Sequence, residues 1–156
     1  MMAEYVILTV QDTDPKADDY LPKIMENKQP WIVRKGEPSK TPRKVLFYVR
    51  GTGKVQGQAD VQRVVSNKPH LLLTEITSDI GLLNDDYEDV TVMYDSFQYW
   101  AYMCQQNKPV DRAVGFRIDE PRMFKRPVKI DRFLPYGMRC MVPIMYYDGK
   151  LPRGVL

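Results

Sequence analysis

The chain has 156 residues, of which 44% are hydrophobic and 28% are charged. This size and composition predict one globular domain with its own core, covering residues 1–150, followed by a short flexible tail at 151–156. No window approaches the roughly 20 apolar residues that a membrane-spanning helix needs, and the first ten residues lack the basic start of a secretory signal. We therefore expect a cytoplasmic protein with no membrane partner.

Cysteine and histidine are scarce. Cys104 and Cys140 are far apart in apolar surroundings, which is typical of free thiols in a reducing compartment. His70 is the single histidine, and the chain has neither a Cys-x-x-Cys pair nor a nucleophile-elbow sequence. The sequence therefore predicts no metal site and no cofactor, and a structural role for His70.

The first half of the chain alternates apolar runs with turn residues. Residues 3–10 are β-branched and apolar, which predicts a buried strand. Apolar residues in 20–25 keep helical spacing, so we expect a short helix with Pro22 in its first turn and Asn27 at its end. Residues 31–35 predict another strand, followed by a polar, proline-rich loop.

Residues 45–50 and 55–65 predict two strands around the sequence Gly51-Thr-Gly-Lys54. A Walker A loop would need glycine where Tyr48 stands and Ser or Thr where Val55 stands, so the loop is predicted to be a hairpin turn rather than a nucleotide cradle. Alternation in the second strand points Gly57 inward and Gln58 outward. The small inward residues predict a close approach of a neighbouring element.

The second half of the chain predicts helices at 69–83 and 95–107. Short strands are expected at 90–93, 112–118, 127–133 and 139–147. Many short strands with two or three inserted helices indicate an α+β fold built on a curled or barrel-like sheet.

The charges are segregated along the chain. Basic residues dominate 28–54, where Glu37 is the sole acid, and 122–139, where Asp131 is the sole acid. Acids dominate 75–95, which has no base. Each run alone is compatible with a solvated surface, but two basic segments of like character are typical of a polyanion binder.

Aromatic residues lie among these cations. Trp31 is close in sequence to Lys28, Arg34 and Lys35, and Tyr48 and Arg50 are on the next predicted strand. Stacking of an unpaired base on an aromatic ring, with cations on the flanking phosphates, is a common way to bind single-stranded nucleic acid. A core position for Trp31 and Tyr48 is the alternative.

The order of these features resembles the ASCH/EVE group of the PUA-like superfold. The hairpin at 45–61 carries Tyr48 and Gly57 in matching places, and further matches lie at 97–100 and 124–127. The resemblance implies a PUA-like curled β-barrel of about six strands, flanked by two or three helices. Lys28 and Arg34 stand for the lysine and arginine of the ASCH signature, but its glutamate is missing and Trp31 occupies the place of a catalytic threonine.

The resemblance and the charge pattern favour a domain that binds RNA or single-stranded DNA, with a modified base as a candidate ligand. Its basic cleft would take phosphate contacts and a stacked base from Lys28, Trp31, Arg34, Lys35, Arg43, Lys44, Tyr48, Arg50 and Lys54. One alternative is a small hydrolase acting on a modified nucleoside or RNA through Lys28 and Glu75. Another is a protein-interaction module that uses the acidic segment 75–95. The sequence favours binding and leaves catalysis open.

Overall fold

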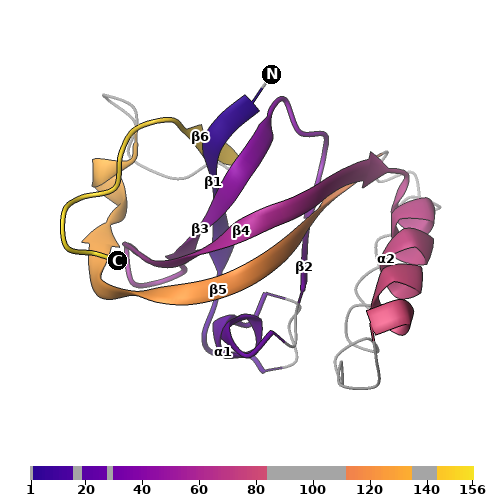
Figure 1. The fold of residues 1–156 in the computed structure, drawn as a ribbon, viewed down its shortest axis with the longest axis horizontal. Helices are drawn as coiled ribbons and strands as arrows, with labels where there is room; N and C mark the ends of the chain where they lie inside the picture. The colour runs from indigo at the N-terminus through magenta and orange to yellow at the C-terminus, as the bar shows by residue number, and fades with distance from the viewer. Residues whose placement is uncertain (1, 16–18, 28–29, 84–111, 135–143) are drawn as a thin grey trace.

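The structure is a computed structural model that describes residues 2–15, 19–27, 30–83, 112–134 and 144–156 (Figure 1). The strand expected at 90–93 and the helix expected at 95–107 lie outside the described residues. So do Lys28 and most of the strand expected at 139–147.

Six strands form one mixed sheet in the order β2-β5-β4-β3-β1-β6 (Figure 1). The strands are Met2–Val10 (β1), Trp31–Lys35 (β2), Thr41–Val49 (β3), Lys54–Asn67 (β4), Ala113–Lys129 (β5) and Met145–Tyr147 (β6). The helices are Leu21–Met25 (α1), Pro69–Leu83 (α2) and the 3-10 turn Ile130–Arg132 (η1). Strand β1 runs parallel to β3, and the other neighbouring pairs are antiparallel. The predicted α+β class is confirmed, whereas no pairing between the edge strands β2 and β6 closes a barrel among the described residues.

The inner face of the sheet holds the main hydrophobic core. Leu8 of β1, Ile32 of β2 and Phe116 of β5 belong to one buried cluster, which α1 completes with Leu21 and Ile24. Strands β1 and β2 are separated by three other strands in the sheet, yet both reach this cluster. The sheet is therefore curled. Arg34 also donates to the carbonyl oxygens of Val33 and Thr9, which ties β2 to β1.

The outer face carries a second cluster, which the C-terminal residues cover. Val155 is 1% exposed and packs with Leu46, Phe124 and Phe133. Its carbonyl oxygen accepts from the backbone N–H of Lys125 at 2.6 Å. Residues 151–156, for which a flexible tail is expected, thus place one apolar side chain against the sheet, while Leu156 is 57% exposed. Burial also raises the pKa of the Tyr5 phenol in this cluster.

Strand β5 runs without a break from Ala113 to Lys129, whereas the sequence predicts two separate strands at 112–118 and 127–133. The last residues of the second predicted strand form the turn η1 instead. The pairing of β5 with β4 accommodates the intervening residues through three register shifts. These shifts also break the alternation along β4, so Gln58, predicted to point outward, is 1% exposed. The close approach predicted at Gly57 is confirmed, since a Cβ there would lie 2.8 Å from the Arg122 carbonyl oxygen.

The hairpin between β3 and β4 has the predicted glycine geometry. Gly51 and Gly53 adopt φ values of 85° and 69°, which side-chain-bearing residues rarely take. Thr52 Oγ1 donates to the Val49 carbonyl oxygen at 2.6 Å and accepts from Lys54 N at 3.1 Å. The loop is a closed turn that presents its cations at one end of the sheet.

Candidate nucleic-acid interface

The two basic segments of the sequence meet at the β3–β4 hairpin. Lys54, the first residue of β4, lies directly opposite Lys129, the last residue of β5. The backbone N–H of Ile130 donates to the Gly53 carbonyl oxygen at 2.8 Å, which fixes β5 against the turn. Arg50 opens the same turn. We call Arg50, Lys54 and Lys129 the cationic end.

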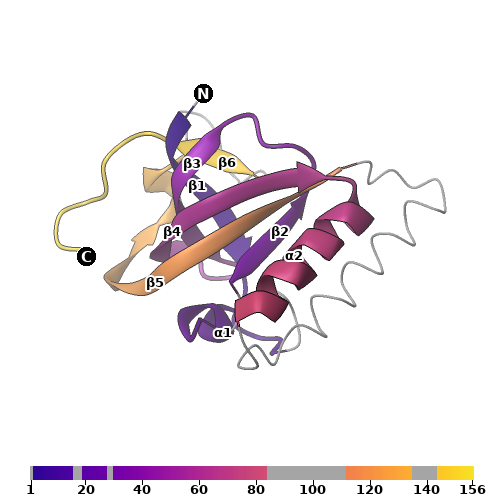
Figure 2. The same ribbon diagram turned by 45° about the vertical axis from the view of Figure 1, so that its right-hand side comes forward.

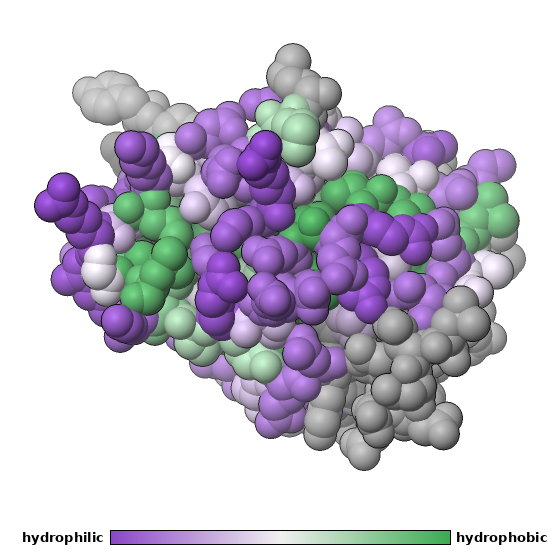
Figure 3. Space-filling model, viewed as in Figure 1, coloured by the Kyte–Doolittle hydropathy of each residue, from purple (hydrophilic) through white to green (hydrophobic). Residues whose placement is uncertain are grey.

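All three residues of the cationic end are exposed. None of the ion pairs in the described part of the chain includes them. Figure 3 shows a mainly hydrophilic surface over the face that carries β4 and β5. Like charges directly opposite each other on neighbouring strands repel. No acid of the described ranges offsets this repulsion between Lys54 and Lys129 through an ion pair.

Other predicted phosphate contacts are already engaged. Lys44 Nζ lies 3.6 Å from Asp60 Oδ1, which Arg122 also approaches at 3.9 Å. Arg34 NH2 lies 3.8 Å from Asp19 Oδ2 in addition to its carbonyl contacts, and its side chain is 17% exposed. These two cations stabilise the fold locally and have less charge to offer a ligand.

The predicted basic residues do not form one surface. Lys35 is exposed at the end of β2, where it pairs with Ala113, the first residue of β5. It is therefore at the opposite end of β5 from Lys129. Arg43 is exposed on β3. The basic segment 28–54 thus contributes to different parts of the molecule.

Trp31 is a core residue. Its side chain is 0% exposed and packs with Leu72 and Ile76 of α2. Its Nε1–H donates to Asp79 Oδ2 at 2.8 Å. Neither face of the ring is open to a base. Trp31 therefore occupies the core position that was the alternative to the predicted stacking role. Tyr48 is partly buried against the outer cluster.

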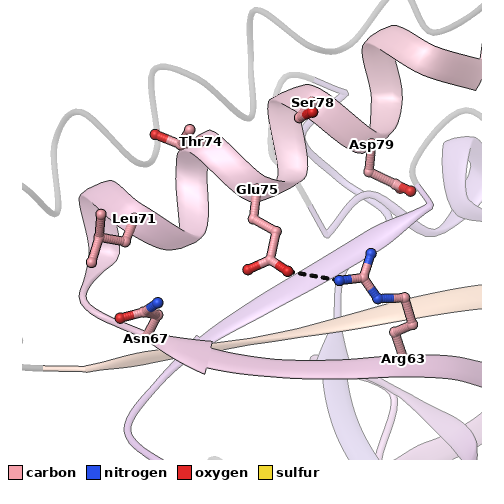
Figure 4. Close-up of a pocket in the computed structure, with 7 residues that line it drawn as sticks. All are labelled: Arg63, Asn67, Leu71, Thr74, Glu75, Ser78 and Asp79. Carbon is pink, nitrogen blue, oxygen red and sulfur yellow. Dashed lines mark hydrogen bonds and ion pairs between the residues drawn. The ribbon is translucent and has the colours of Figure 1, made fainter.

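A groove separates α2 from the second half of β4. Its volume is about 490 Å³. Figure 2 shows α2 lying beside the sheet. Leu71, Glu75 and Asp79 follow one another at intervals of four residues, which places them on one face of α2 toward the strand (Figure 4). The lining residues are Arg63, Asn67, Leu71, Thr74, Glu75, Ser78 and Asp79. We call this feature the α2 groove.

Charged groups in the α2 groove are paired. Arg63 NH2 lies 2.7 Å from Glu75 Oε1 (Figure 4). The Arg63 guanidinium carbon lies 5.7 Å from the centroid of the Trp31 ring. Asp79 Oδ2 accepts from Arg117 Nε at 3.0 Å as well as from the indole. Each carboxylate of the groove therefore has a guanidinium partner.

Glu75 is the predicted partner of Lys28 in a hydrolase site. In the structure it pairs with Arg63, while Lys28 lies outside the described residues, so that lysine–carboxylate site stays a prediction. Sequence reasoning did not find Arg63 or Asp79. The four-residue spacing of Leu71, Glu75 and Asp79 was the available signal for a common helix face.

Neither a membrane-spanning helix nor a metal-ligand cluster is found among the described residues. No helix in these ranges is long and apolar enough to cross a membrane. No three His, Cys, Asp or Glu side chains in the same ranges gather as metal ligands.

Solved structures identify the fold. No protein-family model matches the chain, and no curated protein matches it. The crystal structure of ASCH from Zymomonas mobilis matches with a TM-score of 0.59 and 12% identity over 92% of this chain and 87% of that one. Two mutant forms of the Zymomonas mobilis protein match at the same TM-score, with 13% and 11% identity, each over 97% of this chain. At such identities the likeness concerns the fold, and it covers nearly all of both chains.

Proposed function

The chain has the ASCH-type, PUA-like fold predicted from its sequence, and from this premise we propose that it binds single-stranded nucleic acid, RNA or DNA. The observation that carries the proposal is the pairing of Lys54 with Lys129. That pairing joins two basic segments that are distant in the sequence. A phosphate placed between the two ammonium groups supplies a counter-charge that none of the described residues provides.

The physical basis is counterion release. Each lysine that neutralises a phosphate releases condensed cations, so affinity falls linearly with salt on a logarithmic scale. The cations of the cationic end are exposed. Within the described ranges they hold no ion pair that a phosphate would have to displace.

The remaining predicted contacts rank below the cationic end. Lys35 and Arg43 are exposed and can lengthen the contact path. Lys28 lies outside the described residues, so only its position in the sequence supports its place among the proposed phosphate contacts. Arg34 and Lys44 contribute less because each lies near a carboxylate. The proposal still includes recognition of a modified base. Neither Trp31 nor Tyr48 is assigned to the pocket that would hold it.

The test compares two double variants of equal charge. Lys54→Gln/Lys129→Gln removes the facing pair, and Lys68→Gln/Lys150→Gln removes two exposed lysines from other parts of the chain. Binding of a fluorescent single-stranded oligonucleotide is measured by anisotropy from low to physiological salt. For the first variant we expect the slope of log affinity against log salt to shrink by about 1.4, because each lost phosphate contact removes about 0.7. The second variant keeps the slope of the parent chain.

Two results would contradict the proposal. One is an absence of salt-sensitive binding of RNA and DNA strands by the parent chain at low salt. The other is an equal loss of slope in both double variants, which would indicate a diffuse effect of net charge rather than a site. Circular dichroism on all three proteins checks that each is folded.

A further inference from the structure

We propose that the α2 groove receives an unpaired nucleobase that carries an exocyclic amino group, with Arg63 as the stacking surface. This inference rests on the proposed function, since it assigns the base-recognition site of the same single strand. The groove's volume of about 490 Å³ is within the range of about 300–1,000 Å³ that small-molecule sites occupy.

Arg63 has the geometry of a stacking platform. Its guanidinium lies over the buried Trp31 ring, with 5.7 Å between the guanidinium carbon and the ring centroid. Glu75 fixes its orientation through the 2.7 Å contact, yet 46% of the Arg63 side chain is exposed and it lines the groove (Figure 4). Arginine planes stack on nucleobases as aromatic rings do. The aromatic surface that the sequence placed at Trp31 is thus covered by Arg63, which presents a second flat surface above it.

The helix side of the groove supplies hydrogen-bond acceptors. Glu75 uses Oε1 for Arg63, and Asp79 uses Oδ2 for Trp31 and Arg117. Among the described residues, no hydrogen bond engages the second oxygen of either carboxylate, so each can accept from a ligand. Carboxylates accept from the exocyclic amino group of cytosine but repel the keto oxygen that uracil has at the same position.

The strand side supplies a donor. Asn67 Oδ1 accepts from the backbone N–H of Lys68 at 2.8 Å, which orients the side-chain amide. Its Nδ2 can then donate to a keto oxygen or a ring nitrogen. Acceptors on the helix and a donor on the strand match the edge of a base that has both amino and acceptor groups, and they match uracil poorly.

The charges of the groove make its contribution distinct from that of the cationic end. Arg63 pairs with Glu75 and Arg117 pairs with Asp79, so the groove adds little net charge. It should therefore set base preference without changing the salt slope. The two properties can be measured separately on the same strands.

The experiment uses three single strands of about 12 nucleotides, a length within known site sizes. One contains only cytosine bases, one contains only uracil bases, and one is an abasic backbone with the same number of phosphates. Arg63→Lys keeps the charge and can still reach Glu75, but it removes the planar surface. Arg112→Lys is the matched control, because Arg112 is also an exposed arginine paired with a glutamate, Glu37, outside the groove.

We expect the cytosine strand to bind tightest. Arg63→Lys should weaken its binding by at least about fivefold, the lower end of base-stacking effects. The salt slope should not change, and Arg112→Lys should bind as the parent chain does. A cytidine titration followed by NMR should shift the Trp31 indole N–H resonance in the parent chain more than uridine does.

Failures of the two proposals differ. Strands that bind with a steep salt slope but without base preference, or unchanged binding by Arg63→Lys, overturn the groove assignment and leave the proposed function in place. If no strand binds, the proposed function fails. In that case an unshifted indole resonance with cytidine overturns the groove assignment too, whereas a shift larger than that with uridine supports it as a nucleoside site.

Discussion

The cationic end and the α2 groove are built from opposite ends of the same strand. Lys54 begins β4 and faces another lysine, whereas Arg63 and Asn67 near its other end face a helix that supplies carboxylates. One region leaves its charges exposed without partners among the described residues, and the other pairs each charge. Under the two proposals, one strand carries both non-specific attraction and base selection. Exposed cations attract any phosphate, whereas a charge-neutral network can recognise the edge of a base.

The two regions also differ in what holds them in place. Glycine conformations and backbone hydrogen bonds shape the hairpin turn. The groove depends on Trp31, which is buried beneath Arg63 and anchors Asp79. Changes at the cationic end should therefore alter binding with little effect on stability, and changes beneath the groove should alter stability first.

The largest expected effect is at Trp31. Trp31→Ala should lower the free energy of unfolding by about 3–5 kcal/mol, because it leaves a cavity under α2 and removes one of the two hydrogen-bond donors to Asp79. Urea denaturation followed by circular dichroism measures the loss. Lys54→Ala at the cationic end should change stability by less than about 0.5 kcal/mol. A stable Trp31→Ala protein that binds strands poorly would reverse the comparison and restore Trp31 as a binding residue.

A smaller loss of stability is expected when a glycine in either region is replaced by alanine. A Cβ at Gly115 would lie 3.0 Å from Trp31 Cε3, and the buried ring has little room to move. Gly115→Ala should therefore cost about 1–3 kcal/mol through overpacking. At the hairpin, a Cβ at Gly53 would meet nothing within 4 Å, but φ is 69°.

Gly53→Ala is the variant to compare with Gly115→Ala. It should lower the free energy of unfolding by about 1–2 kcal/mol through backbone strain alone. Gly53→Asn should recover part of this loss because asparagine tolerates positive φ. No asparagine rescue is expected at Gly115. Rescue by asparagine at Gly115, or an absence of rescue at Gly53, would contradict the assigned causes.

Local elements could be predicted from the sequence, and the site could be predicted only in part. The helix at 69–83 and the strand at 31–35 have the expected bounds, because apolar spacing and turn residues determine them locally. The burial of Trp31 depends on which face of β2 the helix covers, and a strand pattern alone does not contain that information. The pairing of Lys54 with Lys129 across β4 and β5 depends on strand order, and the ion pair of Arg63 with Glu75 depends on how α2 packs.

The smallest expected effects are on the free energy of unfolding, and they should have opposite signs in the two regions. Glu75→Gln removes the partner of Arg63 and should cost about 0.2–1 kcal/mol, as exposed ion pairs do. Lys54→Gln removes one of two facing ammonium groups and should raise the urea midpoint slightly. Both changes should shrink as salt is added, because the interactions involve exposed charges. Parallel urea titrations at low and high salt measure both, and a loss of stability in Lys54→Gln at low salt would show that its charge already has a partner in the fold.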